Sequence, residues 1–236
     1  CVKTLLSAAV FLFGVQAAWA QVPEGAGPNL VPNPGFEDRK PNVALPKDDV
    51  DGSAAFRLVI GDWTSPSQTT PDWLIVPQSK IVEAKRNKEL INEPHGGSKM
   101  VGILTHNPQS ERHDTYREYI QARLIKPLRV GAEYYFEFWV CMDHRAKFAS
   151  NNIGFVLSPS PLTRMDAQNK WSPILDAKPD YNITEVINEN KREWVRYSGT
   201  FKAANRAQYL IMGNFFDNKA TIMKDVGRGG TFENAY

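Results

Sequence analysis

Residues 133–140 read Glu-Tyr-Tyr-Phe-Glu-Phe-Trp-Val, and this stretch decides the fold class. Successive side chains of a β-strand point to opposite faces of the sheet. One face of the stretch is apolar and belongs to a core: it holds Tyr134, Phe136, Phe138 and Val140. The other face is the mixture typical of a solvated sheet face: it holds Glu133, Tyr135, Glu137 and Trp139. The alternation therefore predicts a strand whose register is set by burial of one face.

Shorter stretches with strand character lie on both sides of this one, separated by turn signals. They cover residues 98–104, 116–124, 152–158, 193–201 and 208–215. The one short helix that we expect spans Asn182 to Lys191, and no repeat or heptad pattern is visible. Several strands at this spacing, with long loops between them, predict an all-β fold, an antiparallel β-sandwich.

The composition is that of an ordinary globular protein. The chain has 236 residues, of which 42% are hydrophobic and 23% charged. Lys and Arg number 28 and Asp and Glu 26, a balance that excludes a strongly basic nucleic-acid binder. The two cysteines, Cys1 and Cys141, cannot build a disulfide framework. Because Cys141 follows Phe-Trp-Val, we expect its thiol to be buried.

The N-terminus has the pattern of a signal peptide. Lys3 supplies a positive charge, Leu5 to Val15 is apolar, and Ala18-Trp19-Ala20 is a small-x-small cleavage site. The apolar run is too short for a membrane anchor, which needs about 20 residues. We therefore predict a signal peptide over residues 1–20, a linker over 21–28 and a β-sandwich module over 29–236. The protein would then be exported, to the periplasm, the outer membrane or the cell surface.

The stretch Asn29-Leu-Val-Pro-Asn-Pro-Gly-Phe-Glu37 resembles the opening strand of galactose-binding-like jelly rolls, which include many carbohydrate-binding modules. In that pattern a tryptophan follows, and here Trp63 and Trp73 follow. The resemblance implies a jelly-roll topology. It also implies that Glu37 could help to bind a structural Ca²⁺, whose preferred ligands are carboxylate and carbonyl oxygens. The alternative is a solvated glutamate at the end of a strand.

A narrower resemblance covers about residues 29–236. It is carried by Pro94-His-Gly-Gly97, by Tyr116-Arg-Glu-Tyr-Ile120 and by Ser150-Asn-Asn-Ile-Gly154. This succession looks like the N-terminal module of exported Bacteroidetes proteins, many of them OmpA-family outer-membrane proteins. The resemblance implies a final strand that begins at Ala235-Tyr236, so that the sandwich is truncated at its C-terminus. It also implies a peptidoglycan-binding domain further on, and peptidoglycan would be held only through that domain.

The pair Arg117 and Glu118 sits on opposite faces of the stretch 116–124, so one of the two points inward. A buried charge needs a partner, because an unpaired one is expensive. We therefore predict that Arg117 or Glu118 belongs to a salt-bridged cluster that stabilises the sheet.

Two tryptophans in polar loops, Trp63 and Trp171, are the candidate ligand-binding residues. Sugar-binding modules stack pyranose rings on exposed aromatic faces and orient them with a few polar groups. The alternative is that each tryptophan covers an end of the sandwich. Trp73 and Trp194 are interpreted as structural.

Motifs for catalysis are weak. The four histidines have no metal-ligand spacing, and Asp143-His144-Arg145 has no Gly-x-Ser-x-Gly elbow beside it. Carboxylates such as Glu118, Glu133 and Glu137 cannot be paired from sequence for glycoside hydrolysis. We therefore predict a non-catalytic envelope or surface module that binds glycan or an envelope protein. The alternatives are a carbohydrate-binding module of a secreted glycoside hydrolase and an enzyme in its own right.

Overall fold

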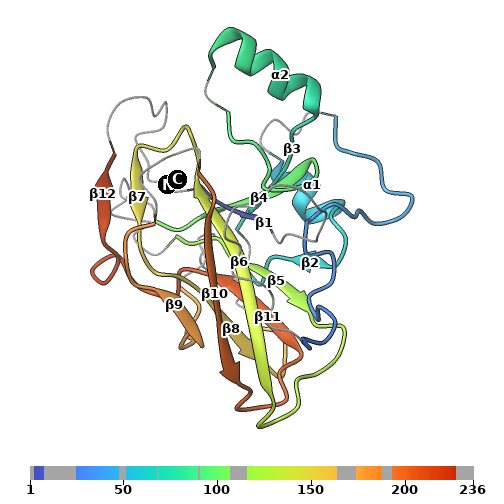
Figure 1. The fold of residues 1–236 in the computed structure, drawn as a ribbon, viewed down its shortest axis with the longest axis vertical. Coiled ribbons are helices and arrows are strands. Elements are labelled where there is room, and N and C mark those ends of the chain that lie inside the picture. Colours follow the sequence, from blue (N-terminus) through green and yellow to red (C-terminus); the bar gives the residue numbers. More distant parts are fainter. Residues whose placement is uncertain are drawn as a thin grey trace, which may run out of the picture.

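The computed structural model describes residues 3–7, 25–47, 52–67, 69–89, 91–106, 116–163, 174–187 and 193–226. Within these ranges the protein is mostly β, with antiparallel sheets and two short helices (Figure 1). This confirms the all-β class. Trp171 lies outside the described residues, as do residues 227–236.

The first sheet contains the strand from which the fold was inferred. Its order is β10 (Val195–Lys202), β6 (Glu133–Met142), β1 (Lys3–Ser7), β4 (Lys99–Leu104) and β3 (Asp72–Ile75). The strands β6 and β10 pair along eight residues of β10, from Val195 opposite Val140 to Lys202 opposite Glu133. These two strands run side by side down the middle of the view in Figure 1, with β10 at the edge of the sheet.

The second sheet has shorter strands. Its order is β2 (Trp63–Thr64), β5 (Ile120–Arg123), β11 (Tyr209–Gly213), β8 (Ile153–Ser158) and β9 (Tyr181–Ile183). A separate two-strand ladder joins β7 (Phe148–Ser150) to β12 (Met223–Asp225). The expected helix over 182–191 is wrong for its described part, because Tyr181–Ile183 is a strand and residues 184–187 are not helical.

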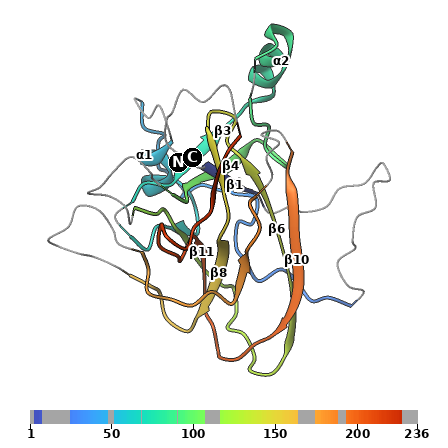
Figure 2. The same cartoon turned by 90° about the vertical axis from the view of Figure 1, so that its left-hand side faces the viewer.

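The main core lies between the two five-stranded sheets, and in Figure 2 the long strands β6 and β10 of the first sheet lie to the right of β8 and β11 of the second. Phe138 and Val140 of β6 are buried in it, as their alternation predicted. The ring of Phe136 meets that of Phe155 of β8 edge-on, with centroids 5.1 Å apart. Such offset and edge-on contacts are the favourable arrangements for aromatic rings. Facing sheets around one shared core are the arrangement of a β-sandwich.

Two helices that the sequence patterns did not indicate cover one end of the first sheet. Helix α1 (Ser53–Leu58) buries Ala55 and Phe56 in the main core. Helix α2 (Gln78–Asn87) follows Pro77, ends at Lys88 in the left-handed conformation, and lies at the end of the molecule in both views. Its Ile81 packs in a small cluster with Val76, Met100 and Cys141.

Cys141 is completely buried in this cluster, as its sequence context predicted. Burial, and next the negative charge of Asp143, raise the pKa of its thiol, and a hydrogen bond from Asn92 opposes them only in part. The thiol is therefore protonated at neutral pH and serves as a small apolar group.

Strand β1 departs from the sequence-based expectation that residues 1–20 stand outside the fold. Residues 3–7 lie in the middle of the first sheet and pair antiparallel with β4 on one side and with β6 on the other. Leu5 and Leu6, which begin the apolar run of the signal-peptide pattern, are suited to a strand as well. Cleavage after Ala20 stays a prediction. No described helix is long and apolar enough to cross a bilayer.

Candidate functional site

The motif around Glu37 forms a turn that is held from several directions. The side chain of Asn33 donates to the carbonyls of Asp38 and Gly61, at 3.0 and 2.9 Å, and accepts from the Asp38 N–H at 2.9 Å. Asn33 and Phe36 both have positive φ, 42° and 59°. Asparagine tolerates this region better than most residues. The side-chain amide of Asn33 thus takes the place of a backbone hydrogen-bond partner for Asp38 and Gly61 and holds the turn in shape.

Both tryptophans that follow the motif donate to this turn. The indole N–H of Trp63 donates to the Asn33 carbonyl at 3.0 Å, and that of Trp73 to the Phe36 carbonyl at 2.8 Å. The rings of Phe36 and Trp63 lie 5.0 Å apart. The succession Asn, Phe and two tryptophans is therefore a packing unit that attaches the start of the module to its core.

Trp63 is for this reason not available for stacking on a sugar. Only 3% of its surface is exposed, and it belongs to the main core. The prediction of a ligand-binding Trp63 is corrected here: the residue has the structural role that was its alternative. The polar residues beside Trp63 in the sequence suggested an exposed loop. The group that accepts its indole N–H lies 30 residues away in the chain, so local sequence does not indicate its burial.

The carboxylate of Glu37 is satisfied by hydrogen-bond donors. Its Oε1 accepts from the N–H groups of Ser98 and Lys99, at 2.8 and 2.9 Å, and its Oε2 accepts from the Ser98 hydroxyl at 3.1 Å. The ammonium of Lys99 lies 3.3 Å from Oε2. Three donors and the charge of Lys99 thus stabilise the carboxylate without a metal ion, and a calcium ion at Glu37 stays a prediction.

Arg117 and Glu118 are both buried, with 0% and 4% of their surfaces exposed. The guanidinium of Arg117 donates to the carbonyl of Phe216 at 3.1 Å and to the side chain of Asn218 at 2.7 Å. The carboxylate of Glu118 accepts from the N–H of Leu104 at 2.7 Å. Both side chains are buried and have polar partners, which agrees with the expectation that one of the two charges points inward. The partners named here are neutral groups, and the predicted salt bridge stays a prediction.

The outer face of β6 has the residues that alternation predicted for it, and they form a network. The carboxylate of Glu137 accepts from the Tyr135 hydroxyl at 2.7 Å and from the Trp139 indole N–H at 3.1 Å. Arg196 of β10 donates to the same carboxylate at 2.9 Å. These bonds hold Trp139 in one orientation on the sheet face.

His95 stacks on Trp139. The two ring centroids are 4.0 Å apart with an angle of 26° between the planes, and the ring of Trp194 meets His95 edge-on at 5.9 Å. Burial lowers the pKa of His95, and the nearby charge of Glu137 opposes this only in part. The imidazole is therefore neutral at neutral pH and behaves as a third aromatic ring beside the two indoles.

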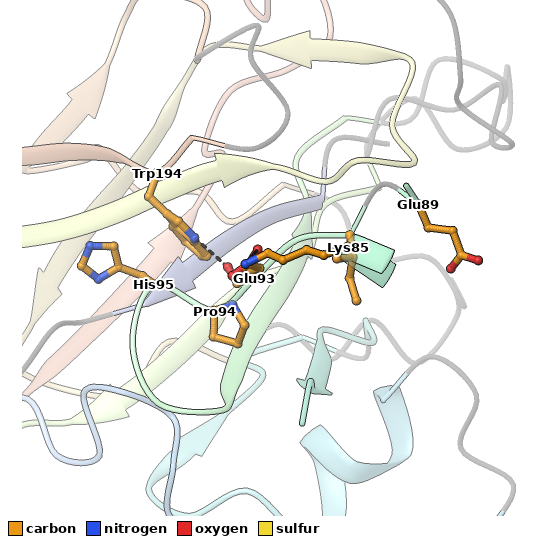
Figure 3. Close-up of a pocket in the computed structure, with 7 residues that line it drawn as sticks. Lys85, Glu89, Glu93, Pro94, His95 and Trp194 are labelled. Atoms are coloured by element: carbon orange, nitrogen blue, oxygen red, sulfur yellow. Dashed lines mark hydrogen bonds and ion pairs between the residues drawn. The ribbon is translucent and has the colours of Figure 1, made fainter. Parts of the chain in front are cut away.

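A hollow of about 320 Å³ opens next to this aromatic group, and we call it the Trp194 hollow (Figure 3). Its lining residues are Lys85, Glu89, Ile91, Glu93, Pro94, His95 and Trp194. The indole of Trp194 stands between His95 and Glu93 in Figure 3, and its N–H donates to the Glu93 carbonyl at 2.8 Å. Lys85 of α2 forms an ion pair with Glu93 at 2.7 Å.

The hollow thus combines an aromatic wall with charged groups at its rim. Trp194 is only partly buried, and the Lys85 and Glu93 side chains are 61% and 44% exposed. The volume lies at the lower end of the range for small-molecule sites, about 300–1,000 Å³. An apolar wall with a few polar groups is the usual composition of such sites.

Asp143-His144-Arg145 lines a neighbouring cleft of about 300 Å³. Arg145 donates to both carboxylate oxygens of Asp143, at 3.1 and 2.7 Å, while His144 contacts the side chain of Asn92 at 2.7 Å. Burial would raise the pKa of Asp143, but the hydrogen bonds and the charge of Arg145 outweigh it and lower the pKa. The carboxylate is held as a structural anion.

Among the described residues, no group of three or more His, Cys, Asp or Glu side chains is placed to hold a metal ion. Sequence reasoning interpreted Trp194 as structural and found no metal-ligand spacing around His95. It missed that the two line one hollow, because β10 and the Pro94–Gly97 turn are about 100 residues apart in the chain. The outward alternation of Trp139 was the one signal that indicated this face.

Comparisons with known proteins identify no relative of this chain: no family model, no curated protein and no solved structure matches it.

Proposed function

We propose that this chain is a non-catalytic β-sandwich module of jelly-roll type that binds glycan at the Trp194 hollow. One observation carries the proposal. The partly exposed indole of Trp194 stands beside His95, with Lys85, Glu89 and Glu93 around the same hollow. Pyranose rings have apolar faces that stack on aromatic side chains, and their hydroxyls bond to carboxylates and ammonium groups.

The surrounding contacts favour a preorganised site. Trp194 is fixed by its bond to the Glu93 carbonyl, and His95 by its stack on Trp139. Trp139 is itself held by Glu137. A ligand that meets groups already held in place loses less entropy on binding than one that must order them.

The signal-peptide pattern of residues 1–20 supports export, and the resemblance to OmpA-family modules supports an outer-membrane parent. In that setting the module is part of the cell envelope or of the cell surface. A peptidoglycan-binding domain, where the parent protein has one, holds peptidoglycan separately, and the Trp194 hollow takes another glycan.

The test is affinity electrophoresis and calorimetry of the protein on panels of soluble polysaccharides and peptidoglycan fragments. Trp194→Ala should weaken binding at least tenfold. Lys85→Met, a change at a side chain that is 61% exposed, should weaken it without loss of fold. The matched control is Tyr209→Ala, which removes a partly buried aromatic residue from β11 of the other sheet.

Trp63→Phe gives a second control, because Trp63 is buried in the core and does not line the Trp194 hollow. It should lower the melting temperature and leave glycan affinity unchanged. Equal affinity of the wild type, Trp194→Ala and Lys85→Met would show that glycan does not bind at the Trp194 hollow. Binding of an envelope protein instead of any glycan would show that glycan is not the ligand.

A further inference from the structure

The end of the sandwich opposite α2 is formed by two loops that lie side by side. One covers residues 124–132 and connects β5 to β6, and the other covers residues 203–208 and connects β10 to β11. Both lie at the bottom of Figures 1 and 2, whereas α2 lies at the top. We call the surface of these two loops, together with the strand-end residues Arg123, Lys202 and Glu133, the basic end.

The two loops are fixed by their own apolar residues. Leu124 and Leu128 are buried in a cluster with Ala203 and Ala207 of the facing loop. The backbone N–H of Leu124 donates to the Gln208 carbonyl and that of Leu128 to the Ala207 carbonyl, at 2.8 and 2.9 Å. The side chains between these anchors are therefore held outward.

Two of the outward side chains are aliphatic. Ile125 is 60% exposed and Val130 is 62% exposed, the highest values among the large apolar side chains of the described residues. Neither can turn inward, because Leu124 and Leu128 already fill the space beneath the loop. A single exposed apolar residue is ordinary, but two on one fixed loop are a feature of interaction surfaces.

The basic end has a strong positive charge. Glu133 is its one acidic residue, opposite Lys202 in the pairing of β6 with β10. Five basic side chains against this one acid give a net charge of +4, compared with +2 for the whole chain. All five are exposed, and none forms an ion pair with another described residue. They are Arg123, Lys126, Arg129, Lys202 and Arg206.

We propose that the basic end binds the surface of a membrane that contains anionic lipids. Ile125 and Val130 enter the boundary between the headgroups and the acyl chains, and the basic side chains around them contact the lipid phosphates. Apolar burial and attraction to anionic lipids are the two contributions that hold proteins at a membrane surface. The proposal is independent of the Trp194 hollow, which lies beside α2 at the other end of the molecule and stays accessible.

The combination of side chains favours a bilayer over an acidic polymer. A nucleic acid or an acidic polysaccharide would pair with the five cations through its phosphate, sulfate or carboxylate groups. It would leave Ile125 and Val130 in water. A bilayer accommodates both kinds of side chain, because the aliphatic stems of lysine and arginine pack on apolar surface while their charged ends stay with the phosphates.

The test is sedimentation of the full chain with vesicles of two compositions. One contains equal parts of phosphatidylglycerol and phosphatidylcholine, and the other contains phosphatidylcholine alone. We expect at least tenfold tighter binding to the anionic vesicles, and a loss of this difference when the salt concentration rises from about 0.1 M to about 0.5 M, because salt screens the attraction.

The aliphatic contribution is tested by the double change Ile125→Ser and Val130→Ser. It should weaken binding to the anionic vesicles at least tenfold and leave the salt dependence in place. The matched control is Val82→Ser with Ile222→Ser, two aliphatic side chains that are 56% and 57% exposed elsewhere on the molecule. The control should bind as the wild type does.

The charged contribution is tested by the triple change Lys126→Gln, Arg129→Gln and Arg206→Gln. It should weaken binding at least tenfold and also flatten the salt dependence. Three exposed basic residues outside the basic end provide a control with the same change in net charge, and this control should bind as the wild type does. The control changes are Lys80→Gln, Arg86→Gln and Lys219→Gln.

Insertion is measured with nitrobenzoxadiazole attached to Ile125→Cys in a chain that also carries Cys1→Ser. Cys141 is completely buried and stays unlabelled. On anionic vesicles the emission should shift to shorter wavelength and be quenched by a spin label in the acyl chains. The same label at Val82→Cys should show neither effect.

Four results would overturn the proposal: no binding to anionic vesicles, equal losses in the variants and their matched controls, a label at position 125 that stays in water, or equally tight binding of dextran sulfate by the wild type and the double serine variant. The last result would assign the basic end to an acidic polymer. Trp194→Ala should leave vesicle binding unchanged, so the membrane surface and the glycan site are tested separately.

Discussion

Glu37 joins two loops that are about 60 residues apart, and its charge is the reason that the bonds are strong. Hydrogen bonds to a charged group contribute about 1.5–3 kcal/mol, but the side chain is 37% exposed and solvent screens the interaction. We expect Glu37→Gln to lower the free energy of unfolding by about 1 kcal/mol at pH 7. Urea unfolding of the two proteins measures the difference, and Lys47→Gln in an exposed loop is the control.

The difference in free energy of unfolding between the wild type and Glu37→Gln should depend on pH, and the direction of this dependence follows from the pKa of Glu37. Burial raises the pKa of Glu37, but hydrogen bonds from Ser98 and Lys99 and the charge of Lys99 outweigh it and lower the pKa from 4.5. The stabilisation is therefore complete above pH 4.5 and disappears as the pH falls through the lowered pKa. The difference between wild type and Glu37→Gln should shrink on acidification. A difference that stays constant between pH 7 and about pH 3 would contradict this account.

At the same scale, the sequence drew attention to Glu37 and Trp63 but did not predict what either side chain contacts. The glutamate at position 37 was singled out as a possible calcium ligand or a solvated residue at a strand end, and the structure shows that its carboxylate accepts from backbone N–H groups and a serine hydroxyl beside the ammonium of Lys99. Trp63 was expected to be exposed because its sequence neighbours are polar. Partners that are 30 or 60 residues away leave no trace in local composition, so neither residue's bonding could be predicted from the sequence.

Strand β8 shows how closely two elements can approach. A Cβ at Gly154 would lie 2.1 Å from the carbonyl oxygen of Tyr181 in β9, and backbone cannot yield as a flexible side chain can. We expect Gly154→Ala to destabilise the protein by about 2–3 kcal/mol through separation of β8 from β9. Thermal unfolding and hydrogen exchange in β9 measure this.

Gly96→Ala is the matched control, because a Cβ at Gly96 meets nothing within 4 Å. Equal melting temperatures for Gly154→Ala and the wild type would show that β9 is not held against β8 in this way.

Elements differ in how far the sequence predicts them. The strand β6 was predicted within two residues because its alternation spans eight residues and both of its faces have a clear character. Strand β5 covers only residues 120–123 of the expected 116–124, because Arg117 bonds to the loop at Phe216 and Asn218, while Glu118 bonds to Leu104 at the end of β4 in the other sheet. Helix α2 was missed because it buries only Ile81 and Ala84, which is too few for a visible period.

At the scale of the whole molecule, the two five-stranded sheets share one core, so neither has an apolar interior of its own. Phe138 of β6 illustrates this. Its ring lies 6.3 Å from that of Phe155 in β8 and 6.0 Å from that of Tyr181 in β9, both in the opposite sheet. Loss of this ring therefore removes contacts from both sheets together.

Phe138→Ala should accordingly destabilise the sandwich as a unit, by about 3–5 kcal/mol, the usual cost of removing a buried phenylalanine ring. Near-ultraviolet circular dichroism reports the aromatic core and far-ultraviolet circular dichroism the strands. The two should give coincident melting curves in wild type and variant, shifted by the same amount, because a single cooperative unit has one transition. Ile125→Ala is the control, since that side chain is 60% exposed and should leave both curves in place. Separate transitions, or a shift seen by only one of the two methods, would mean that the sheets are stabilised independently, and the shared core would then not be what holds this molecule together.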